Sequence, residues 1–268
     1  MRSGSEIRRS GQVTVHPTAI VHPDAELAEG VEVGPYAIIE GTVKIGPDTK
    51  IGPRVSIEGY TLIGAENEIF TGAVVGSRTQ DKKFKGGISY LKIGNRNAIR
   101  EYVTINPGTK EGTETVIGDG NLLMAYAHVA HDCVIQNNTI LANNATLAGH
   151  VIVEDKAVIG GLSAVHQFVR IGKLALIGGC SKVVQDVPPF MIADGHPAKV
   201  FGLNAVGLER AGITKEEKNI LRKALKVIFR SGVTLKNAVL QLEKECLPSA
   251  SIEALIDFLR KSERGICR

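Results

Sequence analysis

The sequence predicts a parallel β-helix of about ten coils followed by a small α-helical domain. An aliphatic residue occupies every sixth position from Val15 to Val183, and only Asp81, Gly87 and Glu111 break this series. A glycine often follows the aliphatic residue, and turn-forming residues fill the next two positions. A helix repeats about every 3.6 residues and a two-sided strand about every 2, so neither explains a period of six. Hexads are typical of a parallel β-helix, in which three consecutive hexads close one triangular coil.

The chain is expected to contain three parts. Residues 1–12 are polar and lack an apolar segment, so we expect a disordered leader and not a secretory signal. The β-helix is expected to span residues 13–190, and the helical domain residues 191–268. The hexad pattern weakens near 77–92 and 107–114, which are expected to be loops extruded from the coil. Loops on a rigid scaffold often carry function.

Composition excludes several classes of protein. The net charge of +4 fits a site for anionic ligands better than a nucleic-acid surface, which usually has a dense basic stripe. No apolar stretch is long enough to cross a bilayer, so no membrane span is expected. The four cysteines, Cys133, Cys180, Cys246 and Cys267, lack metal or redox spacing, which indicates free thiols and a cytoplasmic protein.

Four of the seven histidines lie close together in the repeat, and we call them the histidine column: His128, His131, His150 and His166. Each lies beside an aliphatic position of one series whose members are three hexads apart, so all four are expected on one edge of three successive coils. Positions 75, 93 and 111 continue this series, so the loop near 77–92 is expected to leave from the same edge.

Two kinds of site fit the histidine column. Three imidazoles could bind zinc, as in a γ-class carbonic anhydrase. Alternatively, one histidine could be a general base while the others hold substrate, because the reference pKa of imidazole, about 6.5, lies close to neutral pH. Asp132 directly follows His131 and is a candidate partner for its ring.

The C-terminal part contains three expected helices. Thr214 to Glu217 forms a capping box that opens a helix ending near Arg230. Further helices are expected from Thr234 to about Cys246 and from Ser251 to Ser262. From residue 204 onward, 13 basic and 8 acidic residues give a net charge of +5. This charge could attract phosphates or an acidic protein, or it could belong to ordinary solvated helix faces.

Five segments carry a more specific signal than the hexads: Gln80–Phe84, Asn121–Cys133, Leu141–His150, Ala164–Phe168 and Gln185–Pro189. Together with the repeat, they resemble the UDP-N-acetylglucosamine O-acyltransferases that open lipid A synthesis. The similarity covers residues 13–268. The hexads alone would indicate only the wider superfamily of hexapeptide acyltransferases.

The resemblance implies a left-handed coil and a homotrimer with its site between neighbouring prisms. Because one prism alone would leave the histidine edge open, we expect the loop near 77–92 of one subunit to reach the histidine column of another. It implies transfer of a 3-hydroxyacyl group from acyl carrier protein to the 3-OH of UDP-N-acetylglucosamine. The phosphopantetheine of the carrier protein would hold the acyl group, so no separate cofactor is expected.

The resemblance also assigns residues. His131 matches the general base, with Asp132 beside it. The residues expected to hold the sugar nucleotide or the acyl donor are Asp81, Lys83, His128, His150, His166, Gln167, Asn204 and Arg210. Gly149 and Gly179 are expected to line an acyl-chain groove, with Met191 near its far end. The N–H of Gly149 is a candidate donor to the oxyanion of the reaction.

The chain departs from the family pattern at three positions. Asn106 stands where histidine is common, which leaves open whether the acceptor carries a 3-OH or a 3-amine. Val206 replaces an acidic residue that is common near the uridine site. Pro197 replaces a histidine that is common near the end of the acyl chain, which leaves the acyl length open. A transferase that uses acetyl-CoA is the nearest alternative. Carbonic anhydrase is less favoured, because it expects two histidines five apart, whereas His128 and His131 are three apart.

Overall fold

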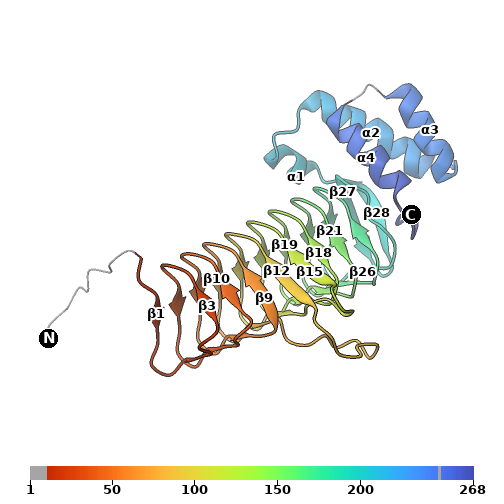
Figure 1. The fold of residues 1–268 in the computed structure, drawn as a ribbon. Coiled ribbons are helices and arrows are strands. Elements are labelled where there is room, and N and C mark those ends of the chain that lie inside the picture. Colours follow the sequence, from red (N-terminus) through yellow and green to blue (C-terminus); the bar gives the residue numbers. More distant parts are fainter. Residues whose placement is uncertain (1–10, 247–248) are drawn as a thin grey trace.

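The computed structural model describes residues 11–246 and 249–268, and it confirms a parallel β-helix followed by helices (Figure 1). The expected leader, residues 1–12, lies outside the described residues except for the last two. No helix within the described ranges is long and apolar enough to cross a membrane.

Three parallel sheets form the faces of the coil. The first contains β1 (Thr14–Val15), β4 (Glu32–Val33), β7 (Lys50–Ile51), β10 (Glu68–Ile69), β13 (Ala98–Ile99), β16 (Leu122–Leu123), β19 (Ile140–Leu141), β22 (Val158–Ile159), β25 (Leu176–Ile177), β27 (Met191–Gly195) and β28 (Ala198–Leu203). The second contains β2 (Ile20–Val21), β5 (Ile38–Ile39), β8 (Ser56–Ile57), β11 (Val74–Val75), β14 (Thr104–Ile105), β17 (His128–Val129), β20 (Thr146–Leu147), β23 (Ala164–Val165) and β26 (Lys182–Val183). The third contains β3 (Glu26–Leu27), β6 (Lys44–Ile45), β9 (Tyr60–Ile63), β12 (Tyr90–Ile93), β15 (Glu114–Ile117), β18 (Val134–Ile135), β21 (Ile152–Val153) and β24 (Arg170–Ile171).

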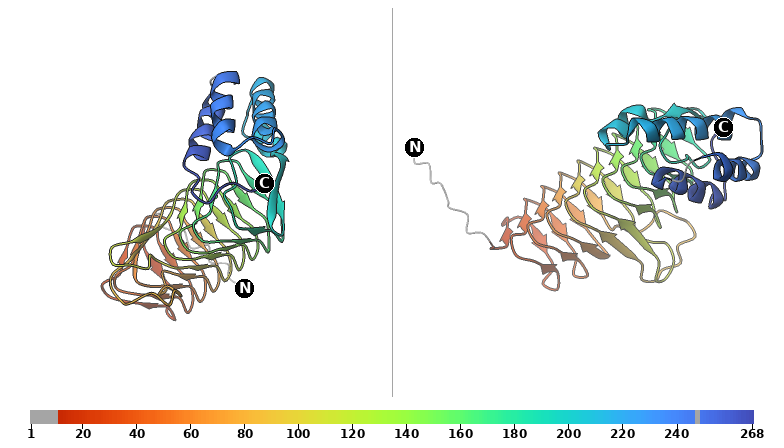
Figure 2. Two further views of the ribbon diagram at one scale, coloured as in Figure 1. Left: turned by 90° about the vertical axis from the view of Figure 1, so that its right-hand side faces the viewer. Right: turned by 90° about the horizontal axis from the view of Figure 1, so that it is seen from above.

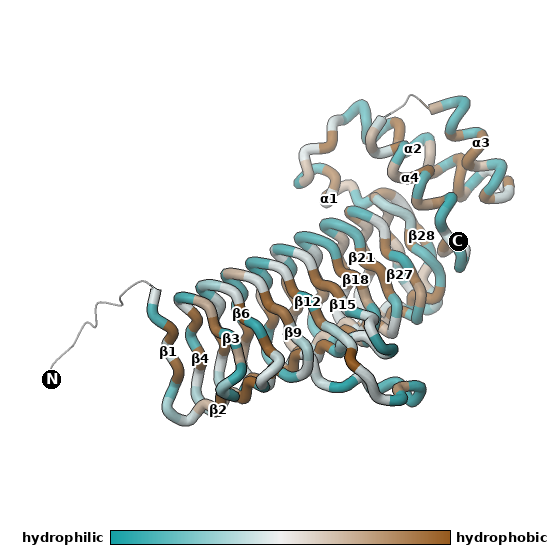
Figure 3. Tube along the Cα trace, viewed as in Figure 1, coloured by the Kyte–Doolittle hydropathy of each residue, from teal (hydrophilic) through white to brown (hydrophobic). Residues whose placement is uncertain are grey.

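The hexad residues hold the coil together from inside. β1 to β24 make eight three-stranded coils, and β25 and β26 begin a ninth, close to the ten expected. From Val33 to Val183, every aliphatic residue of the series is buried, and Figure 3 shows the corresponding apolar band along the strands. Val15, in the first coil, is partly exposed because no coil covers it on one side. Each coil therefore depends on its neighbours for burial of its apolar edge.

Two loops shift the stacking of strands near the histidine column. Val75 pairs with Ile105, five hexads on, and Ile105 pairs with Val129, four hexads on. A regular coil contains three hexads. The first step therefore contains two extra hexads and the second contains one. Together the extra hexads equal one full coil, so the hexads after the second loop return to the sheets that simple counting assigns to them. The expectation that positions 93 and 111 lie in this stack is therefore wrong. Ile93 pairs instead with Ile63 in the third sheet.

The first loop, residues 76–89, and the second loop, residues 106–113, both leave the coil after strands of the second sheet. The first loop stands away from the coil in Figure 1. It is shorter than expected, because β12 already begins at Tyr90. Both loops leave from the corner that carries His131, so the expected placement of the first loop on the histidine edge is confirmed.

The C-terminal part begins as β-structure. β27 and β28 extend the first sheet beyond the expected boundary at residue 190, and the helices begin at Ala205. The helices are α1 (Ala205–Arg210), α2 (Lys215–Arg230), α3 (Leu235–Glu245) and α4 (Ala250–Arg260). The side chains of Thr214, Thr234 and Ser249 cap α2, α3 and α4 by accepting a backbone N–H three residues on. A second apolar core joins the helices to the last coil, which they cover in Figure 2.

Candidate active site

The site lies at the corner that follows the second sheet. Corner positions are counted from the aliphatic residue that ends each strand. At the second position after it, successive coils carry His131, Gly149 and Gln167. At the third position, Asp132, His150 and Phe168 do the same. These three residues have φ values of 58°, 62° and 64°, the left-handed backbone that turns the chain at each corner. The repeat of three hexads per coil therefore brings together side chains that are distant in sequence.

His131 and Asp132 form a hydrogen-bonded pair, as the sequence suggested. The Nδ1 of His131 lies 2.8 Å from Oδ2 of Asp132. A carboxylate oxygen accepts, so Nδ1 carries the proton and Nε2 keeps its lone pair. The same Oδ2 accepts the backbone N–H of Thr109, at 3.1 Å, from the second loop. The imidazole is thus fixed in the tautomer that a general base requires.

The environment keeps Asp132 ionised. Burial raises the pKa of this carboxyl, but hydrogen bonds from His131 and Thr113, nearby His150 and the N–H of Thr109 together hold the pKa below its ordinary value. An ionised Asp132 stabilises a positive charge on the neighbouring imidazole. This is what a base needs at the moment when it accepts a proton.

Gly149 provides the space in which the His131 ring lies. A Cβ built on Gly149 would lie 2.5 Å from Nε2 and 3.0 Å from Nδ1 of His131. Any side chain here would therefore displace the imidazole. Within the described ranges, no hydrogen bond from the Gly149 N–H is found, so this amide remains available to an acyl oxygen.

His150 is held against His131 and Phe168. Its ring meets the His131 ring edge to face, with centroids 5.1 Å apart, and it stacks on Phe168 at 4.5 Å with planes 6° apart. Its Nε2 lies 3.8 Å from Oδ2 of Asp132. Phe168 was not expected in the site. The signal that could have found it is its position three hexads after His150.

The first loop brings Asp81 to the site. Oδ2 of Asp81 lies 3.6 Å from Nε2 of His131 of the same chain, on the side from which a hydroxyl must approach the base. Oδ1 of Asp81 accepts the backbone N–H of Lys83, whose side chain is exposed. Through Asp81, this loop contacts the histidine column of its own chain. The expected contact with the histidine column of a neighbouring subunit stays a prediction.

Two other members of the histidine column lie apart from this pair. His128 is half-buried in β17, with Nδ1 2.7 Å from Oγ1 of Thr104 on the adjacent strand. His166 is exposed, one coil beyond His150, and its Nδ1 faces the carbonyl of Gln167. Gln167 is likewise exposed, and the expected contacts of both residues with substrate stay a prediction.

The structure does not bring four of the expected residues to His131 within one chain. Asn204 is buried, caps α1 by accepting the N–H of Gly207, and donates to the carbonyl of Leu174. Arg210 lies at the end of α1. Gly179 lies at a corner after the first sheet, where a Cβ would meet only the carbonyl oxygen of Gly161, at 3.4 Å. Met191 is fully buried in the second core, so its side chain does not line a groove on this chain.

The side chains of His131, Asp132 and His150 converge closely enough to hold a metal ion, with ligand atoms within 4.8 Å of one another. Their chemistry differs from the three imidazoles of the zinc alternative, because a carboxylate takes the third place. That carboxylate oxygen already accepts hydrogen bonds from His131 and Thr109. The geometry fits an oriented base better than a zinc centre.

The position of His128 makes stability depend on pH. Burial and nearby His131 lower the pKa of His128 in the folded chain. The unfolded state therefore binds more protons below a pH of about 6.5, the reference value. Neutral His128 therefore contributes to the free energy of unfolding above a pH of about 6.5. This contribution is lost as the pH falls through the lowered pKa of His128 in the folded chain. We expect the melting temperature to fall between pH 7.5 and 5.5, and to fall less in His128→Asn.

Thermal melts at fixed protein concentration measure this difference. His22→Asn, which changes an exposed histidine in the first coil, is the control and should keep the wild-type dependence. His150, whose pKa burial also lowers, should leave a residual dependence in His128→Asn. An unchanged pH dependence in His128→Asn would contradict the assignment.

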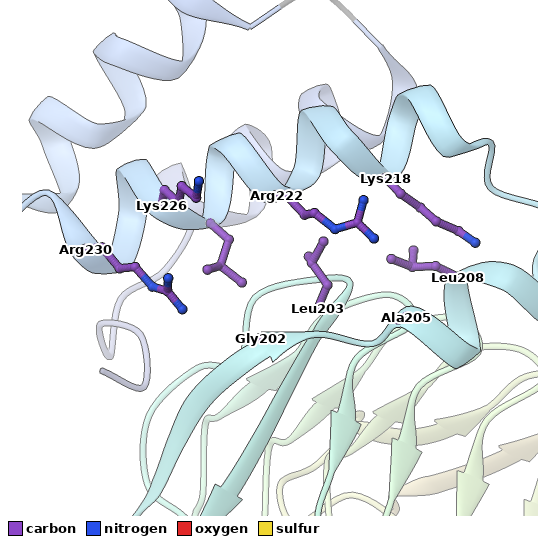
Figure 4. A pocket seen from close by; sticks show the side chains of 9 residues that line it. Gly202, Leu203, Ala205, Leu208, Lys218, Arg222, Lys226 and Arg230 are labelled. Carbon is purple, nitrogen blue, oxygen red and sulfur yellow. The ribbon is translucent and has the colours of Figure 1, made fainter.

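A basic groove lies between α2 and the end of the coil (Figure 4). It has a volume of about 310 Å³ and an apolar floor that includes Leu203, Leu208 and Leu225. Four cations, which we call the cation row, extend from α2 at intervals of four residues: Lys218, Arg222, Lys226 and Arg230. Like charges four apart on a helix repel one another. Of the four, Lys218 lies 3.9 Å from Glu209. The groove therefore carries an excess of positive charge, which favours an anionic ligand.

Two protein-family models match this chain, one within the coil and one in the C-terminal part. Residues 114–149 match the family model of the bacterial transferase hexapeptide, six repeats, which places the coil among hexapeptide-repeat transferases. Residues 186–267 match the model described as UDP-N-acetylglucosamine O-acyltransferase, domain 2, which covers β27, β28 and the helices.

Whole-chain relatives identify the family. The acyl-[acyl-carrier-protein]–UDP-N-acetylglucosamine O-acyltransferase of Trichlorobacter lovleyi is 55% identical over 260 residues, 96% of this chain and 100% of that protein. The protein of the same name from Thermodesulfovibrio yellowstonii is 52% identical, with 95% and 99% of the two chains covered. The solved structure of LpxA from Acinetobacter baumannii is 45% identical, with a TM-score of 0.92 and 95% and 99% coverage. The chain belongs to the UDP-N-acetylglucosamine O-acyltransferase family, and its coil is left-handed as the resemblance implied.

Proposed function

We propose that the protein transfers a 3-hydroxyacyl group from acyl carrier protein to the 3-OH of UDP-N-acetylglucosamine, the first step of lipid A biosynthesis, with His131 as general base. The observation that carries this proposal is the His131–Asp132 pair beside a free Gly149 amide. It occurs in a chain that is 55% identical to an enzyme named for this reaction. The expected cytoplasmic location stays a prediction.

The proton moves first toward His131. A sugar hydroxyl is a weak nucleophile, so Nε2 of His131 removes its proton as the oxygen attacks the thioester carbon. Asp132 holds Nδ1 and stabilises the imidazolium that forms. Asp81, 3.6 Å from Nε2, is placed to accept a hydrogen bond from the sugar.

The acyl oxygen then becomes an oxyanion, which the N–H of Gly149 is placed to stabilise. The tetrahedral intermediate collapses, the carbon–sulfur bond breaks, and the thiolate of the phosphopantetheine arm takes the proton back from His131. The products are the acylated sugar nucleotide and the free thiol of the carrier. The protein groups used in this reaction belong to the corner after the second sheet, except Asp81, which belongs to the first loop, and no covalent enzyme intermediate forms.

Single variants cannot show which donor is used, so the donor itself must be compared. The purified protein should transfer from 3-hydroxyacyl carrier protein and not from acetyl-CoA, with UDP-N-acetylglucosamine as acceptor. Preference for acetyl-CoA would identify a small-molecule acetyltransferase instead. A parallel assay with the 3-amino analogue of the acceptor tests the alternative that Asn106 leaves open. The Nδ2 of Asn106 donates to the carbonyl of Ser77 at 3.0 Å, which ties this residue to the start of the first loop.

The carrier protein is proposed to dock along the cation row, since its phosphodiester is an anion. Charge reversal at Lys226 and Arg230 should raise the KM for acyl carrier protein by roughly tenfold and leave kcat near the wild-type value, because charges at the rim of an interface act mainly on encounter. Steady-state kinetics at low and high salt measure both quantities. Lys244→Glu, an exposed reversal on α3, is the matched control. A wild-type KM in the double variant would place the carrier elsewhere.

The active assembly is proposed to be a homotrimer. Asn204 and Arg210 match the family's binding positions but lie in the helical part, away from the His131 corner of their own chain. A neighbouring prism would supply the second wall of the cleft, and Gly179 would leave that groove open to a long acyl chain. Sedimentation should show an active trimer. An active monomer would contradict a shared site.

A further inference from the structure

Asp132 faces two imidazoles with the same oxygen. Its Oδ2 lies 2.8 Å from Nδ1 of His131 and 3.8 Å from Nε2 of His150. The first distance is a hydrogen bond and the second exceeds one. If the His150 ring turned so that Nε2 moved closer, it would compete with His131 for the carboxylate. The proposed base would then lose part of the interaction that stabilises its protonated form.

Phe168 opposes that rotation. The His150 ring lies between two other rings, since it stacks on Phe168 at 4.5 Å with planes 6° apart and meets the His131 ring at 89°. Stacking of parallel rings favours this one orientation over others. The contact follows from the coil, because Asp132, His150 and Phe168 occupy the same corner position in three successive coils.

Phe168 has no evident role in folding. The residue is 51% exposed and belongs to neither apolar core of the described chain. Its ring nevertheless covers a titratable side chain of the site. We propose that Phe168 is a positioning residue for the reaction: it fixes the His150 ring and thereby reserves the Asp132 carboxylate for His131. This inference rests on the proposed function, since it assigns His131 the role of base.

The test is a double-mutant cycle in the acyl carrier protein assay. Phe168→Leu removes the ring face and should lower kcat about tenfold, on the scale of one lost aromatic pair, with little change in the KM for UDP-N-acetylglucosamine. Phe168→Tyr keeps the ring and should retain near-wild-type kcat. In a His150→Asn background, Phe168→Leu should cause no further loss, because its effect passes through His150. Tyr36→Leu is the matched control, because Tyr36 is an exposed aromatic with the same left-handed backbone at a corner that follows the first sheet, away from the site.

Several results would overturn the inference. They are wild-type kcat in Phe168→Leu, the same fold loss in both backgrounds, and a loss confined to the KM for the sugar nucleotide, which would make Phe168 a simple binding wall. Thermal melts verify folding, and Phe168→Met provides a second ring-free variant should Phe168→Leu melt early. If His131→Ala is inactive while both ring-free variants are fully active, the inference fails and the proposed function stands. If His131→Ala is active, the proposed function itself fails.

Discussion

His131→Ala should lower kcat by about 10²–10⁴-fold while the protein remains folded and assembled, because the reaction would lose its general base. The His131 side chain is 15% exposed and lies outside the interior of the coil, so its removal leaves the apolar core intact. The KM for either substrate should change much less than kcat. Initial rates with 3-hydroxyacyl carrier protein and UDP-N-acetylglucosamine measure the loss.

Two further variants separate the base from its surroundings. Asp132→Asn keeps the shape of the side chain but removes its charge, so it should also lower kcat, because the imidazolium is no longer stabilised. His22→Ala removes an exposed histidine from the first coil and should be fully active. Near-wild-type turnover of His131→Ala, with folding verified by thermal melting, would exclude His131 as the base.

The periodic part of this fold was predictable because its period is a property of the sequence itself. With three hexads per coil, a residue and its stacking partner are related by simple counting, and this count alone places His131 and His150 on one edge. The helix starts were equally local. Thr214 and Thr234 each cap a helix through a contact only three residues long.

Features that the hexad count does not determine were not predictable, and the division of the extra residues between the two loops is the first of them. An insertion of two hexads followed by an insertion of one hexad leaves the repeat in the same phase as one extra coil. The hexad pattern alone therefore cannot show how many hexads belong to each loop. α1 has six residues and no apolar period that would distinguish it from a loop. The sequence did not reveal that the amide of Asn204 caps a helix and donates to the carbonyl of Leu174, and its expected role in substrate binding stays a prediction. Met191 is buried because the helices pack over β27.

Phe168 was missed for a different reason. The candidate site was assembled from side chains that can titrate or donate, and a phenylalanine does neither. Its relation to His150 was nevertheless available from the count of three hexads between them. In a coil of this kind, the corner positions one coil before and after a catalytic residue belong to the same site, because stacking makes them neighbours.

Gly149→Ala should be nearly as damaging as loss of the base, with kcat reduced at least about 10²-fold. The new Cβ would lie 2.5 Å from Nε2 of His131, closer than any real Cβ contact. The ring cannot turn aside freely, because its Nδ1 is bonded to Asp132 and its other side meets His150. The methyl group must therefore displace the imidazole that accepts the proton, and it also crowds the amide proposed to stabilise the oxyanion.

Gly161→Ala is the matched control, since Gly161 occupies the same corner position after another sheet and its Cβ would meet a backbone oxygen of Asn143, at 3.2 Å, and no imidazole. It should reduce stability slightly and leave kcat within a few-fold of wild type. Both variants are compared by initial rates and thermal melting. The informative result is a large loss of turnover in Gly149→Ala at a similar melting temperature, because an added methyl group would then act on the base and not on the fold. Equal turnover in the two variants would show that the His131 ring need not lie over Gly149 for the reaction to occur.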